Sequence, residues 1–334
     1  MLDATLVAPA SIGRAAGAGR TAAVPLCKGD GMKFGAVLPT CEIGDDPGAV
    51  RDWAQAAESL GYAHIVAYDH VLGAEHAGRD PKLWGPYTEH DAFHEPFVTF
   101  GFLAGVTSTI ELETAVIILP QRQTALVAKQ AAEVDVLSGG RLRLGVGTGW
   151  NHVEYESLGV DWVSRGKIFD DQIELLRALW TNDVVDHASD HHRIDRAGIK
   201  PRPARSIPIW FGGFSTVAMR RAARIGDGFT FASAGRKTIE QVEQLRAALS
   251  AEGRDPATFP VELTIPYGLG EDKWVSLSTE ARDAAISHLG VNTMSTTSEW
   301  SGTPAPNLTS PAEHIAALET FITTVGAATE GGER

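Results

Sequence analysis

Cysteine is scarce in this 334-residue chain, with Cys27 and Cys41 its only two. Two cysteines are far too few for a disulfide-stabilised scaffold, which is typical of small secreted domains. This scarcity favours a reducing compartment and predicts a cytoplasmic protein. Long apolar runs are missing as well, since no window approaches the roughly 20 apolar residues that a membrane-spanning helix needs. The sequence therefore argues against a membrane partner.

Positive charge is in short supply. Lys and Arg number 29 against 42 Asp and Glu, which gives a formal net charge of -13. Binding a nucleic-acid backbone requires clustered basic residues, so this balance argues against a nucleic-acid partner. It leaves room for a single anionic cofactor, which one Arg and a few backbone amides can hold. The hydrophobic fraction of 43% is ample for one large domain or two smaller ones.

Metal-binding patterns are also lacking. Histidines gather in two groups, but neither shows an HExxH motif or a Cys/His spacing, so we expect solvated loops and no metal. The groups are His76, His90 and His94, and His187, His191 and His192.

The two ends differ from the middle of the chain. Residues 1–31 are rich in Ala, Gly and Arg, show no convincing period and lack the continuous apolar core of a secretory signal. We expect a disordered N-terminal extension, or an upstream start codon with Met32 as the working start. A single domain over residues 32–327 and a flexible tail over 328–334 complete the expected organisation.

One stretch, from Ile110 to Glu154, predicts a strand, a helix, a second strand and a glycine loop. Ser138-Gly139-Gly140 would end the helix, because glycine readily adopts the left-handed conformation found there. Two strands joined by one crossover helix lie parallel. Ligands in such folds bind beyond the carboxyl ends of the strands, so TAVIILPQRQ and GVGTGWN should line a site.

The same alternation of strand and helix continues along the chain. Asp46-Pro47 and Pro96 predict helix starts, and Thr238 with Gln241 predicts a capping box. A further helix should follow Thr279, and a last one should run from Ser310-Pro311-Ala312-Glu313 to Gly326. Residues 184–206 predict a hairpin or an irregular excursion. The expected strands are 33–38, 64–68, 110–119, 142–146, 207–211, 228–231, 259–267 and 291–296.

Eight strands, each followed by a helix, predict a (β/α)₈ TIM barrel with insertions at its C-terminal face. A doubly wound sheet is the alternative. It usually has fewer strands and a GxGxxG first loop, whereas the first loop here is PTCEIGDD.

Several motifs in order resemble the bacterial luciferase-like superfamily, and within it the flavin- or deazaflavin-dependent oxidoreductase branch whose usual cofactor is coenzyme F420. The resemblance runs from about Lys33 to Phe231 and more weakly to Gly326. It implies the same barrel. The motifs are KFGAVLP, YDH, TAVIILPQRQTALVAKQAAEVDVLSGGRLRLGVGTGWNHVEYESLG, IFDDQIELLRALW and PIWFGGFSTVAMRRAARIGDGF.

Asp69-His70 ends a strand on the face where barrel sites lie. A histidine there can move protons at neutral pH, because its ordinary pKa is about 6.5. The resemblance implies that His70 lies beside the deazaflavin ring as an acid or base. A histidine hydrogen-bonded only for structure is the alternative.

Thr114-Ala115-Val116 matches, by resemblance, a strand bulge beneath the ring, with a non-prolyl cis peptide between Ala115 and Val116. Without the resemblance, TAVIIL is a buried strand. Gln121 and Arg122 follow that strand and could reach the ring edge or the phosphate tail. An exposed arginine is the plainer interpretation of Arg122.

The glycines of GVGTGW lack the spacing of a dinucleotide fingerprint. Gly147 and Gly149, like Gly145, form a small-residue rim that would let a planar ring approach the backbone. Thr148, Trp150 and Asn151 would then face cofactor or substrate, although Trp150 could equally be core.

The loop Gly212-Gly213-Phe214-Ser215-Thr216 precedes a predicted helix. Free amides at a helix N-terminus bind anions, so the loop is a candidate phosphate site, and the resemblance places the cofactor phosphate there. A plain turn capped by Ser215 or Thr216 is the alternative.

The function predicted is F420-dependent hydride transfer to or from a small, partly apolar organic substrate. A flavin mononucleotide (FMN) monooxygenase and a non-catalytic flavin-binding relative are the alternatives, and a homodimer is possible. Aromatic residues in the carboxyl-face excursions are candidates for the substrate pocket, namely Trp84, Tyr87, Phe93, Trp274 and Trp300.

Overall fold

The computed structural model describes residues 31–330, without the side chains of Glu299 and residues 328–330. All but the last residue of the expected N-terminal extension lies outside the described residues, as do residues 331–334 of the expected tail. Within the described part, no helix is long and apolar enough to cross a membrane.

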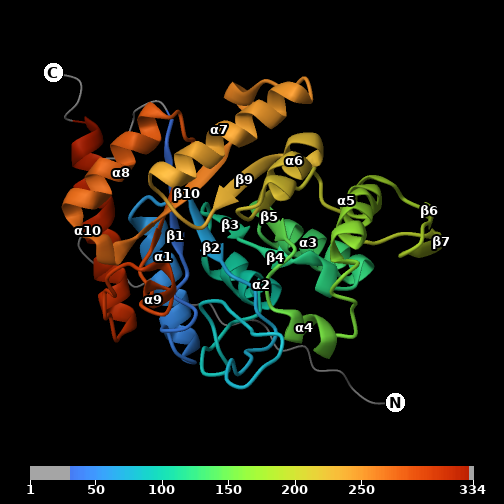
Figure 1. Ribbon diagram of the computed structural model, residues 1–334, viewed down its shortest axis with the longest axis horizontal. Helices are drawn as coiled ribbons and strands as arrows, with labels where there is room; N and C mark the ends of the chain where they lie inside the picture. The colour runs from blue at the N-terminus through green and yellow to red at the C-terminus, as the bar shows by residue number, and fades with distance from the viewer. Residues whose placement is uncertain (1–30, 331–334) are drawn as a thin grey trace, which may run out of the picture.

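The centre of the molecule is a closed barrel of parallel strands (Figure 1). β3 and β4 occupy one position in it, because both pair with β5, and β3 also pairs with β2 to close the ring. The expected eight-stranded (β/α)₈ barrel is therefore confirmed. The strands are β1 (Lys33–Val37), β2 (His64–Ala67), β3 (Glu111–Thr114), β4 (Ile117–Ile118), β5 (Leu142–Gly147), β8 (Ile209–Gly212), β9 (Gly228–Phe231), β10 (Val261–Pro266) and β11 (His288–Asn292).

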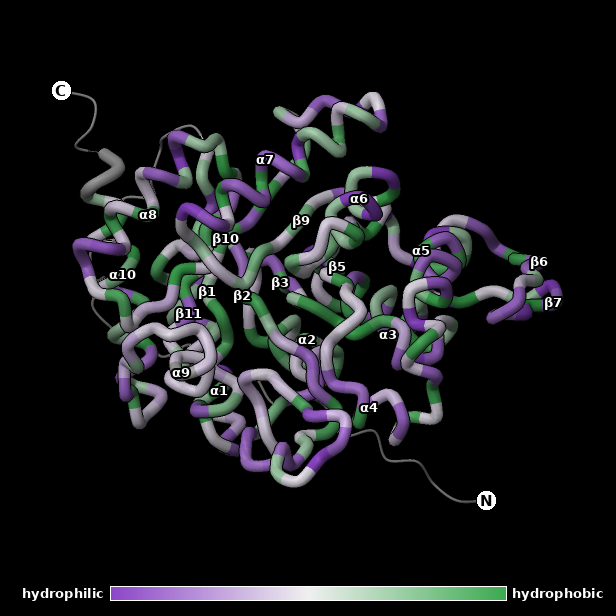
Figure 2. The backbone as a smooth tube through the Cα atoms, viewed as in Figure 1, coloured by the Kyte–Doolittle hydropathy of each residue, from purple (hydrophilic) through white to green (hydrophobic). Residues whose placement is uncertain are grey.

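Helices surround this barrel and cover its outer surface. Their apolar faces pack on the strands, and Figure 2 shows the apolar colour concentrated there. The helices are α1 (Pro47–Ser59), α2 (Pro96–Val106), α3 (Thr124–Leu137), α4 (His152–Ser157), α5 (Arg165–Thr181), α6 (Thr216–Ile225), α7 (Arg236–Ala251), α8 (Glu271–Asp283), α9 (Ser298–Ser301) and α10 (Pro311–Glu330), with short 3₁₀ turns at Leu119–Gln121, Pro256–Thr258 and Tyr267–Leu269.

Local signals for helix ends are confirmed at several places. The Asp46 side chain accepts from the Gly48 amide before α1, and Glu95 caps α2. Gly139 and Gly140 both have positive φ after α3. Residues 184–206 do form a hairpin, in which β6 (Val185–Ala188) and β7 (Arg193–Ala197) pair antiparallel away from the barrel (Figure 1).

Two predicted helix starts are wrong. α7 begins at Arg236, so Thr238 lies inside it and bonds to Ser233, while Gln241 donates to the carbonyl of Phe214. The pair therefore joins the helix to neighbouring loops and forms no capping box. α8 begins at Glu271 rather than after Thr279, because Trp274 already provides a buried anchor.

Two predictions near the C-terminus also need correction. The last strand is His288–Asn292, so it starts three residues before the predicted strand 291–296, and residues 293–297 form a loop. α10 continues past Gly326 to Glu330. Gly326 is buried in this helix, where a small residue is tolerated against neighbouring structure, so it does not end it.

The third predicted strand, 110–119, is broken in the structure. β3 ends at Thr114 and β4 starts at Ile117, and the peptide bond between Ala115 and Val116 is cis, as the resemblance implied. Apolar periodicity could not reveal this break, since both halves are buried.

Candidate active site at the carboxyl face

His70 lies three residues beyond the end of β2, at the carboxyl face of the barrel. Its ring packs against Tyr87, Phe93 and Trp150, with centroid distances of 5.1, 4.9 and 5.4 Å. Tyr87 and Phe93 belong to the long excursion between β2 and α2, which Figure 1 shows beside α4. These rings leave only 9% of the His70 side chain exposed.

Glu154, on α4, is the polar partner of His70. Its Oε2 lies 3.0 Å from His70 Nδ1, and its Oε1 accepts from the amides of Val71 and Leu72 at 2.7 and 3.1 Å. Burial by itself disfavours the ionised carboxyl. The hydrogen bonds from His70 and the two amides outweigh that effect and hold the pKa of Glu154 below its ordinary value. Glu154 could not be predicted as a site residue from the sequence, because one acidic residue on a short helix carries no motif.

Asn151 positions the helix that carries Glu154. Its side chain accepts from the amides of Val153 and Glu154 and is 2% exposed. It is thus the N-cap of α4, and its side chain is engaged in capping. Trp150, next to it, stacks on the half-exposed Trp84 at 6.2 Å. The ring of Trp150 also lies against Gly85, where a Cβ would come within 2.4 Å of it.

Asp69 and Arg122 hold the floor of the site together. Asp69 Oδ2 accepts from the Ile118 amide at 2.9 Å, and Asp69 Oδ1 accepts from Arg122 Nη2 at 2.6 Å. Glu95 Oε1 accepts a hydrogen bond from Arg122 Nη1 at 2.8 Å. Arg122 is only 13% exposed, so the plain expectation of an exposed arginine is wrong. The carboxylates of Asp69 and Glu95 thus neutralise the Arg122 guanidinium. Asp69 also connects the segment after β2 to β4 through the Ile118 amide.

Two glycines within β5 make room for the broken strand. A Cβ on Gly145 would lie 1.7 Å from the Thr114 carbonyl oxygen, and a Cβ on Gly147 would lie 2.5 Å from Val116 Cγ2. Val116 likewise needs Gly212, where a Cβ would lie 2.5 Å from its Cγ1. Glycine is therefore required at these positions because the chain at Thr114–Val116 approaches them closely.

Gln121, in the 3₁₀ turn after β4, is a buried polar residue whose side chain lacks hydrogen-bond partners among the described residues. It is 5% exposed, and neither its amide nitrogen nor its amide oxygen has a hydrogen-bond partner among the described residues. A buried side-chain amide normally has hydrogen-bond partners. The unpartnered NH₂ donor and carbonyl acceptor of Gln121 would therefore suit a ligand with an acceptor and a donor on adjacent atoms.

A cavity of about 370 Å³ adjoins the same loops. It brings together four predicted residues, Gly147, Thr148, Gly212 and Ser215, from two loops. Ser215 is also the N-cap of α6, since its Oγ accepts from the Ala218 amide at 3.2 Å. The phosphate-loop and capping interpretations are thus compatible.

Two arginines that the sequence analysis missed also line this cavity. Arg221 is bound by Asp170 at 2.5 Å, and Arg165 lies over the Trp162 ring at 3.6 Å. Arg165 is the first residue of α5, where acidic residues are usual because the helix dipole favours them. A basic helix start is the signal that could have revealed it.

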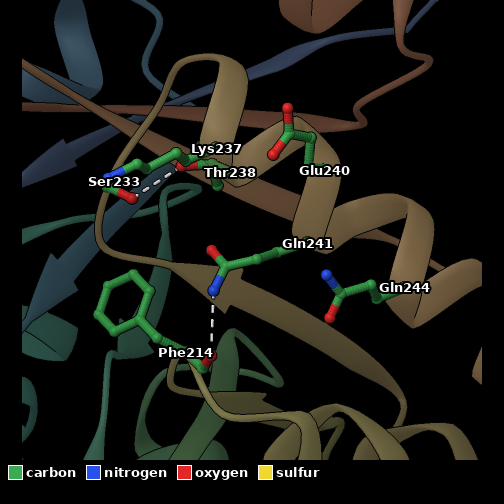
Figure 3. Close-up of a pocket in the computed structure, with 7 residues that line it drawn as sticks. All are labelled: Phe214, Ser233, Lys237, Thr238, Glu240, Gln241 and Gln244. Atoms are coloured by element: carbon green, nitrogen blue, oxygen red, sulfur yellow. Dashed lines mark hydrogen bonds between the residues drawn. The ribbon is translucent and has the colours of Figure 1, made fainter.

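A second cavity, of about 390 Å³, lies beside α7. Figure 3 shows Gln241 reaching from the helix to the Phe214 carbonyl, with Ser233, Lys237 and Thr238 around it. None of the predicted catalytic or cofactor-binding residues lines this cavity.

Trp274 and two of the clustered histidines make contacts that stabilise the fold. Trp274, expected in a substrate pocket, is 3% exposed and packs against Tyr267 and Phe321, so it is a core residue. His187 and His192 both bond to Asp171, at 2.9 and 2.6 Å, and so attach the β6–β7 hairpin to α5.

One buried cluster lies inside the barrel, at the opposite end of the strands from His70. His64, Glu113 and Glu262 present ligand atoms within 4.8 Å of one another, a grouping that could hold a metal ion. Arg143 already supplies positive charge there, because its Nη1 donates to Glu113 at 2.6 Å. The cluster thus has a protein counter-ion of its own.

The closed parallel barrel, with polar residues gathered at the carboxyl ends of its strands, defines a (β/α)₈ protein whose candidate site lies where such barrels bind ligands. The chain belongs to the luciferase-like monooxygenase family, whose model matches residues 32–314.

Relatives in sequence cover part of the chain. An uncharacterised protein of Mycobacterium tuberculosis is 38% identical over 184 residues, which are 53% of this chain and 62% of that protein. An F420-dependent glucose-6-phosphate dehydrogenase of Intrasporangium calvum is 30% identical over 233 residues, 64% of this chain and 69% of that enzyme.

Solved structures share the fold at lower identity. An F420-dependent secondary alcohol dehydrogenase, in complex with an F420-acetone adduct, is 17% identical with a TM-score of 0.67, over 88% of this chain and 99% of that one. A riboflavin lyase with modified FMN and riboflavin is 20% identical with a TM-score of 0.63, over 76% and 67%.

Proposed function

We propose that this protein is an F420-dependent oxidoreductase acting on a small, partly apolar organic substrate. The observation that carries the proposal is His70, whose Nδ1 faces Glu154 and whose Nε2 has no hydrogen-bond partner among the described residues. Such a nitrogen at the carboxyl face is free to take or give a proton. F420-dependent enzymes among the sequence relatives and the fold neighbours support the choice of cofactor.

Residues at and beyond the carboxyl ends of several strands would fit a planar cofactor with an anionic tail. Gln121 offers an unpartnered donor and acceptor for a polar ring edge. Thr114, Ala115 and Val116 form the bulge on which a ring would rest, and Gly149 and Trp150 would flank it. Gly212, Gly213 and Ser215, with Gly147 and Thr148, would hold a phosphate at the start of α6.

When bound, coenzyme F420 supplies a carbon that accepts or donates hydride. The protein would orient the substrate, exclude water with the rings around His70, and move the accompanying proton through His70 Nε2. Asp69 would act indirectly, because Arg122 and the Ile118 amide engage its carboxylate. We do not assign Asn151 a contact with the cofactor, since its side chain caps α4.

An FMN-dependent monooxygenase is the second candidate, which the name of the family and the riboflavin lyase neighbour favour. A non-catalytic flavin-binding relative is the third. Expression in a host that makes F420, followed by the absorption spectrum of the purified protein, tests the first against the others. We expect a deazaflavin spectrum, and an FMN spectrum would contradict the proposal.

A homodimer remains part of the proposal. α2 and α3 pack together, and both expose apolar side chains, among them Val98 and Phe102 on α2 and Leu126 and Leu137 on α3. Apolar side chains gathered on adjacent helices suit contact with a second copy.

A further inference from the structure

Glu154 and His70 come from segments far apart in the sequence, yet the structure brings them into a defined pair. His70 follows β2, and Glu154 lies on the short helix α4 after β5. Their contact of 3.0 Å joins His70 Nδ1 to Glu154 Oε2, and the glutamate is 1% exposed. The carboxylate is therefore held away from water and directed at one ring nitrogen.

The second carboxylate oxygen of Glu154 has hydrogen bonds of its own. Glu154 Oε1 accepts from the amides of Val71 and Leu72, the two residues that follow His70. Both amides are donors only, so this position requires an acceptor. The rings of Tyr87 and Phe93 hold the imidazole itself in place.

These contacts determine where the proton of a neutral His70 lies. An ionised carboxylate only accepts hydrogen bonds, so Nδ1 must carry the hydrogen and Nε2 must present its lone pair. We propose that Glu154 is a positioning residue that fixes His70 in the Nδ1–H tautomer, so that Nε2 faces the substrate as the proton acceptor. This deepens the proposed function, on which its catalytic meaning rests.

Glu154→Gln is a sharp test because the geometry predicts that His70 changes from the Nδ1–H to the Nε2–H tautomer. The amides of Val71 and Leu72 demand the glutamine oxygen, which directs its NH₂ group at His70 Nδ1. Nδ1 must then accept, and the hydrogen moves to Nε2. The variant retains an acceptor for both amides, so it should fold.

The readout is made on cofactor-free protein. Nitrogen-15 NMR of histidine-labelled protein distinguishes protonated from bare ring nitrogens, and the signal lost in His70→Gln identifies His70. We expect the Nδ1–H tautomer in the wild type and Nε2–H in Glu154→Gln. Glu156→Gln, the same change at an exposed position on α4, should leave the wild-type pattern. Nε2–H in the wild type, or an unchanged tautomer in Glu154→Gln, would overturn the proposal.

Turnover gives a second readout. With F420 and a substrate, kcat of Glu154→Gln should fall at least about 100-fold while KM stays within about threefold, because a wrong tautomer removes the proton acceptor and leaves binding intact. A kcat equal to the wild-type value would contradict the role. Absence of F420 turnover in the wild type would instead count against the proposed function, and the tautomer measurement would still stand.

Discussion

At the scale of single residues, the proposed chemistry depends on His70. The histidine is clamped by aromatic rings on one side and by Glu154 on another, so little of its freedom remains. Replacing it with Ala removes the proton acceptor but leaves Gln121 and the glycine loops untouched.

We expect His70→Ala to lower kcat by about 100-fold or more, the usual contribution of a positioned acid or base, with the cofactor dissociation constant within a few-fold of wild type. Steady-state kinetics and a separate binding titration measure the two quantities. His90→Ala is the matched control, since the His90 side chain is 84% exposed. Unchanged turnover in His70→Ala would remove the residue from the mechanism and favour a binding-only protein.

A second histidine contributes to the dependence of stability on pH. His64 is fully buried in the barrel, and burial, with Arg143 adding to it, lowers its pKa to about 3 despite the opposing charge of Glu113. The unfolded chain takes up this proton near pH 6.5, whereas the folded protein resists it. The stabilisation is therefore present above pH 6.5 and is lost as the pH falls from 6.5 toward 3.

At pH 4.5 the loss from His64 should reach about 3 kcal/mol relative to pH 7.5, since pH 4.5 lies about two units below the unfolded pKa and each unit corresponds to about 1.4 kcal/mol. Urea unfolding at both pH values measures it. His64→Gln keeps a donor for Glu262 and should lose less stability between the two pH values, while His90→Gln should behave as wild type. An equal loss in wild type and His64→Gln would contradict this assignment.

At the scale of elements, the junction of β3, β4 and β5 shapes the site. Between β3 and β4, Val116 lies close to Gly147 and Gly212, which belong to the neighbouring strands β5 and β8. Gly145 and Gly147 are thus explained by close packing against Thr114 and Val116 before any ligand is considered.

Gly145→Ala should destabilise the protein by about 1–3 kcal/mol or prevent folding, because its Cβ would fall 1.7 Å from the Thr114 carbonyl oxygen. Thermal unfolding measures the effect. Gly105→Ala on α2 is the control, as nothing lies within 4 Å of its Cβ and alanine favours a helix by up to about 1 kcal/mol. Equal unfolding temperatures for the two variants would show that the close approach does not matter.

The sequence predicts elements well where one local signal suffices. Asp46 and Ser310 both cap helices as expected, because a cap depends on neighbours within a few residues. The signal at Thr238 and Gln241 was misleading, since their partners, Ser233 and the Phe214 carbonyl, are set by tertiary packing. Long-range contacts of this kind have no period or motif that a sequence displays.

At the scale of the whole molecule, the count of alternating strands and helices was enough to predict the barrel, because eight strands that are each followed by a helix match a (β/α)₈ barrel. The site was harder. His70 and the candidate phosphate loop could be named as predictions, because strand ends and helix starts can be recognised in a sequence. Glu154 and Arg221 could not, because each acts through a partner from a distant element.

The central claim concerns the cofactor. Purified, cofactor-free protein titrated in parallel with F420 and with FMN tests it most directly, with bound ligand followed by fluorescence and oxygen consumption recorded alongside. We predict saturable binding of F420, a rise in unfolding temperature with its concentration, and no oxygen consumption. Tight binding of FMN with oxygen consumption, and no binding of F420, would contradict the account.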